Sequence, residues 1–162
     1  MQELIIGLGS NLGDRRKNIE AAIALIGERI GLVTAVSTFV ETEPWGFESE
    51  NKFLNCAIIV GEESCSSQPY SSRASEIIGI LQSIEYGFGR VRTGVYTDRA
   101  IDLDILFYGD EILNEPGLIV PHPKLHERNF ILMSLIELCP EKMHPVIGKT
   151  IRELWDLPQP PP

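Results

Sequence analysis

The 162-residue chain carries 14 Lys and Arg residues against 23 Asp and Glu, which gives a formal net charge of −9 at pH 7. A general nucleic-acid-binding protein needs a basic face, so this balance argues against that class. No apolar run approaches the roughly 18 residues of a membrane-spanning helix, and the N-terminus lacks a signal-peptide pattern. We therefore expect neither nucleic acid nor a membrane among the partners.

The cysteine content indicates a reducing compartment. Cys56, Cys65 and Cys139 are odd in number, and their spacing matches neither a metal site nor a redox motif. We therefore expect a cytoplasmic protein. The length suits a single domain with a sizeable core, which we place at residues 1–157, followed by a Pro-rich tail at 158–162.

The N-terminal half alternates short apolar segments with amphipathic ones. A buried strand is predicted over residues 3–9, and Asp14 can cap the helix that follows, whose apolar residues recur at helical spacing. Gly31 is predicted to end this helix. Two further strands and a second helix are then predicted over residues 33–39, 53–60 and 69–86.

Aromatic residues gather around the third predicted strand. Trp45 and Phe47 lie in the Pro- and Gly-containing loop before it, and such a loop either packs on a core or receives a flat ligand. Phe53 and Asn55, two residues apart, share one face of the strand itself. This segment is therefore a candidate binding surface for a flat heterocycle.

Two carboxylates mark the fourth predicted strand. Asp102 and Asp104 alternate with apolar residues, so both point to one face, about 7 Å apart at the backbone. Mg²⁺ takes one or two carboxylates and completes its shell with water and phosphate oxygens, so the pair suits this ion. The alternative is the solvated face of an ordinary strand.

An arginine-rich loop precedes this strand. Arg90, Arg92 and Arg99 fall within residues 89–99, where glycines and the absence of hydrophobic periodicity predict a loop. Arginine suits bidentate phosphate recognition. With the neighbouring aspartates, the loop predicts a site for magnesium and a polyphosphate, and a merely solubilising loop is the alternative.

The C-terminal part supplies a turn at residues 109–110, a short strand at 118–120 and a helix at 131–138. His122 and His126 have the i, i+4 spacing of metal ligands, but Pro123 opposes a helix across them, so phosphate contacts suit them better than zinc. The order strand–helix–strand–strand–helix–strand predicts an α+β, ferredoxin-like split βαβ antiparallel sheet with additional C-terminal helices.

Six short motifs occur in order along nearly the whole chain. They are Gly9-Ser10-Asn11-Leu12-Gly13, Thr42-Glu43-Pro44-Trp45-Gly46, Phe53-Leu54-Asn55, Gly89-Arg90-Val91-Arg92, Asp102-Leu103-Asp104-Ile105 and Val120-Pro121-His122-Pro123, followed by Arg128 and Phe130. Together they resemble the hydroxymethyl-dihydropterin pyrophosphokinases of folate biosynthesis. The resemblance implies an ATP-dependent enzyme that transfers pyrophosphate to the hydroxymethyl group of a reduced pterin, releases AMP and uses two Mg²⁺ ions.

The same resemblance implies a role for each site residue. Asp102 and Asp104 would hold both metal ions. The pterin side would consist of Thr42, Trp45, Phe53, Asn55 and Phe130, with the two phenyl rings on either face of the pterin. The ATP side would consist of Gln82, Glu85, Arg90, Arg92, Arg99, Ile105, His122 and Arg128. Of these, Arg90, Arg92 and Arg99 would also be catalytic.

The sequence departs from the family pattern in two places. Tyr96-Thr97-Asp98 stands where the family usually has Trp-Gly-Pro, and the loop is shorter. The charge of Asp98 is expected to repel the triphosphate, so that Asp98→Asn should tighten ATP binding. Ser134 stands where proline is usual, and only a local structural effect is expected.

Two other functions stay open on the residues alone. A two-metal nucleotidyl transferase also uses paired aspartates on a ferredoxin-like sheet, but it releases pyrophosphate instead of AMP. A pterin- or nucleotide-binding module would bind without turnover. Small-molecule substrates are the expected partners, and no obligatory protein partner is inferred.

Overall fold

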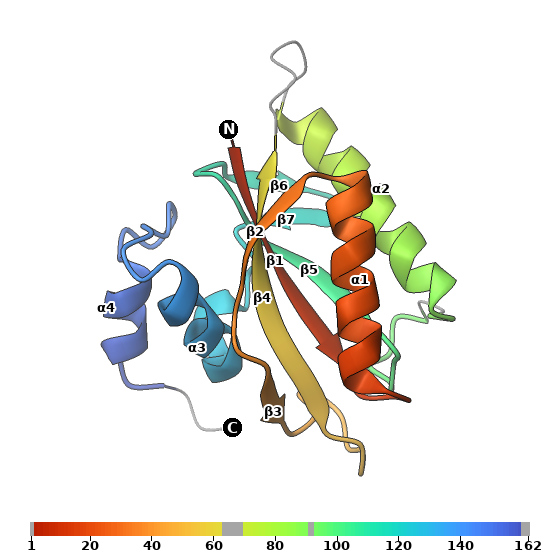
Figure 1. Ribbon diagram of the computed structural model, residues 1–162. Helices are drawn as coiled ribbons and strands as arrows, with labels where there is room; N and C mark the ends of the chain where they lie inside the picture. The colour runs from red at the N-terminus through yellow and green to blue at the C-terminus, as the bar shows by residue number, and fades with distance from the viewer. Residues whose placement is uncertain (1, 63–69, 91–92, 160–162) are drawn as a thin grey trace.

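The computed structural model describes residues 2–62, 70–90 and 93–159. Its centre is a five-stranded antiparallel sheet with strand order β2-β4-β1-β5 and with β3 beside β4 (Figure 1). The strands are β1 (Gln2–Ser10), β2 (Leu32–Val36), β3 (Val40–Thr42), β4 (Phe53–Glu62) and β5 (Asp102–Tyr108).

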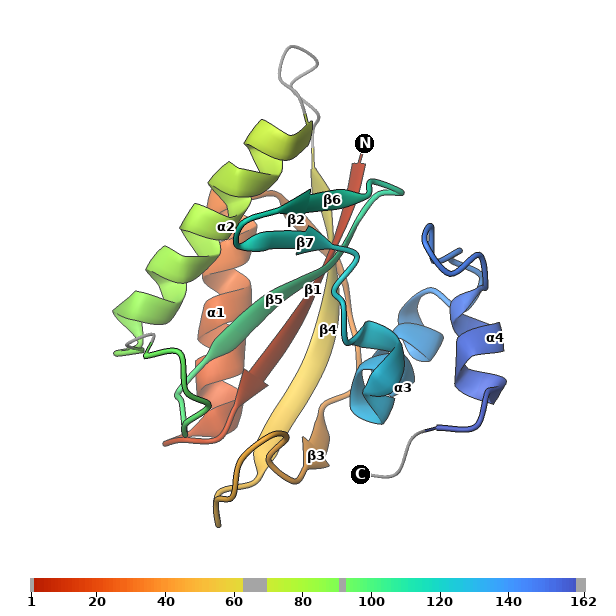
Figure 2. The same cartoon turned by 180° about the vertical axis from the view of Figure 1, so that it is seen from behind.

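Helices cover both faces of this sheet. The helices α1 (Arg15–Arg29) and α2 (Tyr70–Gly87) lie on one face, and α3 (Asn129–Leu138) and α4 (Ile151–Asp156) lie on the other (Figures 1 and 2). Because β4 lies between β1 and β2, the chain order β1-α1-β2-β4-α2-β5 is that of a split βαβ sheet. The predicted fold is confirmed.

Shorter elements complete the fold. A hairpin of β6 (Leu113–Glu115) and β7 (Leu118–Val120) packs beside β5 and α2 (Figure 2). The 3-10 helix η1 (Leu125–Glu127) then leads into α3. None of the helices in the described part of the chain has the length and hydropathy of a membrane span.

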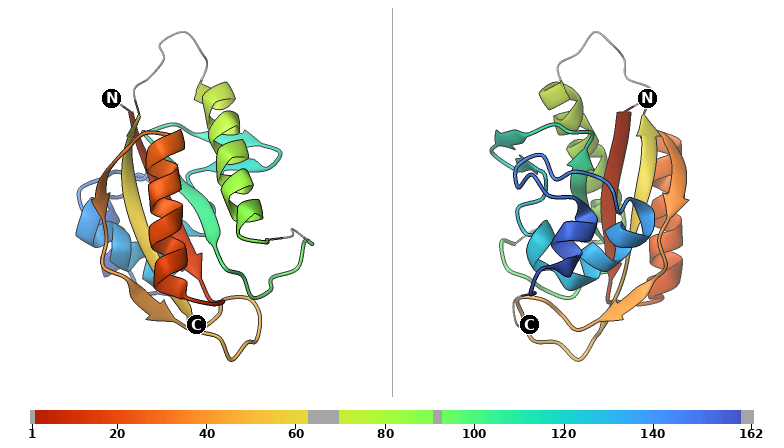
Figure 3. Two further views of the ribbon diagram at one scale, coloured as in Figure 1. Left: turned by 45° about the vertical axis from the view of Figure 1, so that its right-hand side comes forward. Right: turned by 90° about the vertical axis from the view of Figure 1, so that its left-hand side faces the viewer.

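The period-two alternation of β1 divides the core into two layers. Leu4, Ile6 and Leu8 are buried toward α1 and α2, whereas Ile5 is buried toward α3 and α4. Figure 3 shows the two pairs of helices that cover these layers on opposite faces of the sheet. The end of the second layer, where α3 begins, is the part of the fold that positions the candidate site.

The ends of α1 partly match the sequence interpretation. The Asp14 side chain accepts a hydrogen bond from the Lys17 backbone at 3.1 Å, so the predicted cap is confirmed. Gly31, however, does not adopt a left-handed conformation, and the C-cap residue is Ile30. A Cβ on Gly31 would lie 2.5 Å from the Gly61 carbonyl oxygen, so close packing against β4 requires this glycine.

The strand predicted over residues 33–39 was too long. It ends at Val36, and the following segment contains β3, which the sequence interpretation had assigned to a loop. β3 pairs Thr42 with Phe53 and Val40 with Asn55. This pairing brings Thr42 beside two residues of the predicted pterin side.

Candidate active site

A cavity of about 220 Å³ opens at the end of the sheet where α3 begins. Residues of β4, β1 and β5 form its floor. Its walls come from the β3–β4 loop, the segment before β5, and the start of α3. Segments that are distant in the sequence therefore converge on one hollow.

The floor owes its depth to a glycine in the central strand. Gly9 of β1 lies directly opposite Asn55 of β4 on one side and Asp102 of β5 on the other. A Cβ on Gly9 would lie 2.9 Å from the Asn55 side-chain oxygen and 3.4 Å from the Phe53 ring. A strand glycine commonly marks such a close approach.

The second row of the floor repeats this arrangement. Gly7 lies between Ala57 of β4 and Asp104 of β5. Asp102 and Asp104 both line the cavity, on the same face of β5. The small residues of β1 thus separate the two carboxylates from the aromatic side of the cavity.

The two carboxylates have different environments. Burial and the nearby charge of Asp102 raise the pKa of Asp104 to about 7, against the opposing effect of Arg128. Asp102 is bound by the Arg90 guanidinium, and Arg99 Nη2 lies 3.4 Å from its other oxygen. The cavity therefore holds a carboxylate whose negative charge is incompletely compensated.

Arg90 is held from beneath by Glu85, the last acidic residue of α2. The Glu85 carboxylate is buried, and one oxygen accepts hydrogen bonds from Arg90 Nη1 and from the Leu103 backbone, both at 2.8 Å. The family resemblance placed Glu85 on the ATP side of the site. In the structure it joins Arg90 to β5, and it is not among the residues that line the cavity.

Only some of the other predicted ATP-side residues line the cavity. Arg90, Arg99, His122 and Arg128 line the cavity. Gln82 is exposed on α2, and Ile105 is buried in the core layer under α1 and α2, so neither lines it. Arg92 lies outside the described residues.

All five predicted pterin-side residues line the cavity: Thr42, Trp45, Phe53, Asn55 and Phe130. The Asn55 amide donates a hydrogen bond to the Thr42 hydroxyl at 2.7 Å, which fixes the orientation of the amide. The cavity thus presents aromatic rings together with one oriented amide.

Two arginines lie closer to the aromatic side than the sequence interpretation implied. The Arg99 guanidinium carbon is 5.2 Å from the centre of the Phe53 ring, and that of Arg128 is 4.3 Å from the Trp45 ring. Both distances are typical of cation–π contacts. Because Arg99 also lies near Asp102, it lies between the aromatic rings and the carboxylates.

His122 is uncharged at neutral pH. Burial and the neighbouring Arg128 lower the pKa of its imidazole to about 4. Its Nδ1 accepts a hydrogen bond from the Lys124 backbone at 3.1 Å, so the neutral ring carries its proton on Nε2. His122 can therefore donate one hydrogen bond into the cavity.

Sequence reasoning missed several lining residues. Tyr96 packs edge-on against Trp45, with ring centres 6.3 Å apart. Ser134 donates a hydrogen bond to the Phe130 carbonyl at 3.2 Å and also lines the cavity. The glycines of β1 carried a signal, because glycine is unfavourable in a central strand without a packing reason. Tyr96 and Ser134 stood out only as departures from the family pattern, which gave no indication that they line the cavity.

The comparisons with known proteins point to one family. Residues 5–140 match the family model described as 7,8-dihydro-6-hydroxymethylpterin-pyrophosphokinase. A 2-amino-4-hydroxy-6-hydroxymethyldihydropteridine pyrophosphokinase of Porphyromonas gingivalis is 38% identical over 149 residues, covering 90% of this chain and 95% of the relative. The enzyme of that name from Bacillus subtilis is 40% identical over 135 residues, covering 83% and 76% respectively.

The fold is also found among solved structures. The crystal structure of Plasmodium falciparum HPPK-DHPS matches with a TM-score of 0.72 at 16% identity. The match covers 96% of this chain but 44% of the Plasmodium chain. At this identity the likeness concerns the fold alone.

Proposed function

Since this chain belongs to the 7,8-dihydro-6-hydroxymethylpterin-pyrophosphokinase family, we propose that ATP and Mg²⁺ bind next to the pterin in the cavity that contains Asp102 and Asp104. The chain is an enzyme of folate biosynthesis, a pyrophosphokinase that acts on hydroxymethyl-dihydropterin. ATP is its co-substrate. The residues that perform each part of the reaction are proposed below.

Asp102 and Asp104 are the proposed ligands of two Mg²⁺ ions. The raised pKa of Asp104 supports this, because burial and the neighbouring Asp102 charge both disfavour its ionised form, which a bound cation would stabilise. Mg²⁺ takes one or two carboxylates and completes its shell with water and substrate oxygens, so this pair suits it. Bound Mg²⁺ would neutralise charge on the ATP phosphates and help to align them.

The aromatic half of the cavity is the proposed pterin site. Phe53 and Phe130 would contact the faces of the flat ring, and the Asn55 amide would bond its edge. Thr42 supports this role through its hydrogen bond to Asn55, and Trp45 closes the side next to Tyr96. The depth left by Gly9 gives a flat heterocycle room between them.

The arginines are proposed to act on the phosphates. Attack of the hydroxymethyl oxygen on the β-phosphorus of ATP, with departure of AMP, depends mainly on positioning and charge stabilisation. Arg90 and Arg99 lie beside Asp102, where they would stabilise the charge that develops on the transferred phosphates. Arg128 and neutral His122 would add hydrogen-bond donors to the same phosphates. From the sequence alone we propose Arg92 as a further catalytic residue and Gln82, Glu85 and Ile105 as ATP contacts.

The observation that carries this proposal is the convergence of carboxylates, arginines and aromatic rings in one cavity. We propose that residues 1–157 act as one catalytic domain and that the enzyme works in the cytoplasm. The test is an assay with purified protein, ATP, Mg²⁺ and the reduced pterin, in which AMP and pyrophosphorylated pterin should appear together. Pyrophosphate release would instead identify a nucleotidyl transferase, and binding without either product would identify a binding module.

A further inference from the structure

The carboxylate of Asp98 lies between two asparagine side chains from other parts of the chain. Asn51 Nδ2 donates to one of its oxygens at 2.7 Å, and Asn11 Nδ2 donates to the other at 2.8 Å. Hydrogen bonds from Ser49, Asn51 and Asn11 hold the pKa of Asp98 below its usual value. The negative charge of Asp98 is therefore stabilised by these hydrogen-bond donors.

Asn11 extends this bridge to the arginine that follows. Its side-chain oxygen accepts a hydrogen bond from the Arg99 backbone N–H at 2.7 Å, and its own backbone N–H donates to the Arg99 carbonyl at 3.0 Å. The Asn11 amide also donates to the Asn51 carbonyl at 3.1 Å. Asn11 is 3% exposed, so these bonds are shielded from competing water.

The two segments joined in this way form facing walls of the cavity. Residues 43–52 carry Trp45 and Phe47, and residues 96–99 carry Tyr96 and Arg99. Across the gap Tyr96 packs edge-on against Trp45, with ring centres 6.3 Å apart, and the Arg99 guanidinium carbon lies 5.9 Å from the centre of the Phe47 ring. Hydrogen bonds to a carboxylate are stronger than those between neutral groups, so the bridge acts together with these ring contacts to hold the spacing of the walls.

We propose that Asp98 is a positioning residue for pyrophosphoryl transfer, which holds Arg99 and Tyr96 at a fixed place relative to the aromatic wall through Asn51 and Asn11. This inference rests on the proposed function of the cavity. It replaces the expectation from sequence that Asp98 repels the triphosphate, because Asp98 does not line the cavity and its oxygens face amide donors.

The first test is Asp98→Asn. An amide at this position offers one acceptor oxygen and turns its NH₂ group toward the NH₂ group of Asn11 or Asn51, so one bond of the bridge is lost. We expect kcat to fall about tenfold and the KM for the pterin to rise, as the loss of one charge-assisted hydrogen bond allows. ATP binding should not tighten.

The second test exchanges the two partners. Asn51→Asp places a carboxylate against Asp98 and should lower kcat at least as much as Asp98→Asn does. In the double variant Asn51→Asp/Asp98→Asn, the amide at position 98 can donate to the carboxylate at position 51 and still accept from Asn11. We expect kcat of the double variant to return to within about threefold of the wild-type value.

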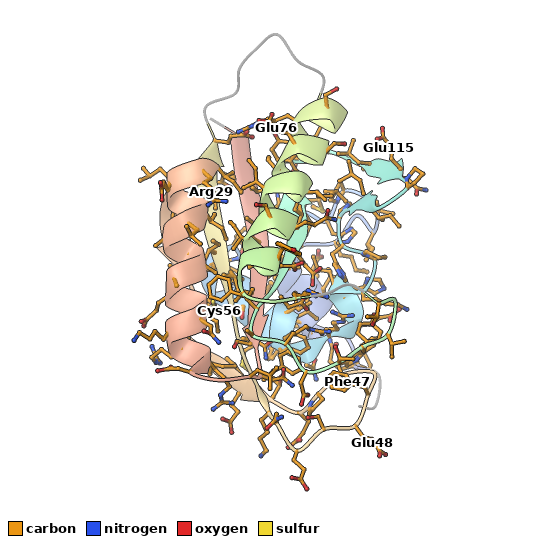
Figure 4. The ribbon with its side chains drawn as sticks, turned by 90° about the vertical axis from the view of Figure 1, so that its right-hand side faces the viewer. Arg29, Phe47, Glu48, Cys56, Glu76 and Glu115 are labelled. Atoms are coloured by element: carbon orange, nitrogen blue, oxygen red, sulfur yellow. The ribbon has the colours of Figure 1, made fainter. Side chains whose placement is uncertain are left out.

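A matched control lies on the same loop. Glu48 is exposed at the lower end of the molecule in Figure 4, and its carboxylate has no hydrogen bond or ion pair within the described residues. Glu48→Gln removes one negative charge at a similar place in the chain. It should leave kcat and both KM values unchanged, which separates the bridge from a general charge effect.

Two outcomes would overturn the inference. If Asp98→Asn, assayed well below its melting temperature, keeps the wild-type kcat, the bond only stabilises the fold. If the exchanged double variant stays as slow as Asn51→Asp, the Asp98–Asn51 bond is not the reason for the loss. Hydrogen exchange adds a readout independent of turnover, because peptides spanning residues 43–51 and 93–98 should lose protection together in Asp98→Asn. Absence of AMP release by the wild-type protein would instead refute the proposed function.

Discussion

Gly9 of β1 faces Asn55 of β4 so closely that a Cβ on the glycine would lie 2.9 Å from the Asn55 side-chain oxygen. Real Cβ atoms do not approach to this distance, so any larger residue at position 9 must displace Asn55 or Phe53. Glycine is therefore required at position 9 by the close packing in the cavity and not by the backbone conformation of a turn.

Gly9→Ala should weaken pterin binding by at least about tenfold, because the displaced amide loses its ligand-bonding geometry. Isothermal titration with the pterin measures this. Gly79→Ala is the control, since a Cβ on Gly79 of α2 meets nothing within 4 Å, and it should leave the affinity unchanged. Unaltered pterin affinity in Gly9→Ala would show that Asn55 does not bind the ligand.

The pKa of Asp104 predicts a pH-dependent stability. Its folded pKa of about 7 lies above the ordinary value of 3.8, so the protonated form is favoured in the folded protein. Stability is therefore lost as the pH rises from about 4 to 7, because the unfolded chain releases this proton above its ordinary pKa while the folded protein keeps it until about pH 7. Asp104→Asn should raise the melting temperature of the metal-free protein at pH 8 by roughly 2–4 °C or more, and much less at pH 4.

The same group predicts how metal binding responds to pH. Mg²⁺ needs the ionised carboxylate, so its binding should release a proton and weaken as the pH falls below about 7. Titration calorimetry in two buffers of different ionisation enthalpy measures this proton. Zero proton release at pH 6.5 would contradict the assignment of Asp104 as a ligand.

Glu85 offers a choice between two roles. If it acts by holding Arg90, Glu85→Gln should lower kcat/KM about tenfold in the wild-type background and little further in Arg90→Ala. If it contacts ATP itself, as the sequence interpretation proposed, the two losses should add. A double-mutant cycle on kcat/KM for ATP decides, and the hydrogen bond of 2.8 Å favours the first result.

Phe53→Ala and Phe130→Ala should each weaken pterin binding by about 1–3 kcal/mol, from lost stacking and apolar contact. Phe53 is 6% exposed, so its truncation should also lower the melting temperature. Phe39→Ala is the control, because Phe39 packs on the core away from the cavity. It should lower stability without changing pterin affinity, and a Phe53→Ala variant that behaves in the same way would place that ring in the core only.

Local patterns were sufficient for the fold and for part of the cavity. The period-two alternation around Asp102 and Asp104 put both carboxylates on one face of a strand, and β5 has that geometry. Helical and strand periodicities, read in order, gave the split βαβ arrangement, because each element must bury its apolar face. The ordered motifs identified the family, which the comparisons support.

Partners that are distant in the sequence were decided by the tertiary structure. Asn11 and Asn51 lie 87 and 47 residues from Asp98, and no periodicity reports that such side chains will meet. Asp98 and Glu85 looked from the sequence like charges facing a nucleotide, whereas folding pairs them with Asn51 and with Arg90. A carboxylate is read from the sequence as a charge, but its role depends on the donors that the fold brings within hydrogen-bonding distance.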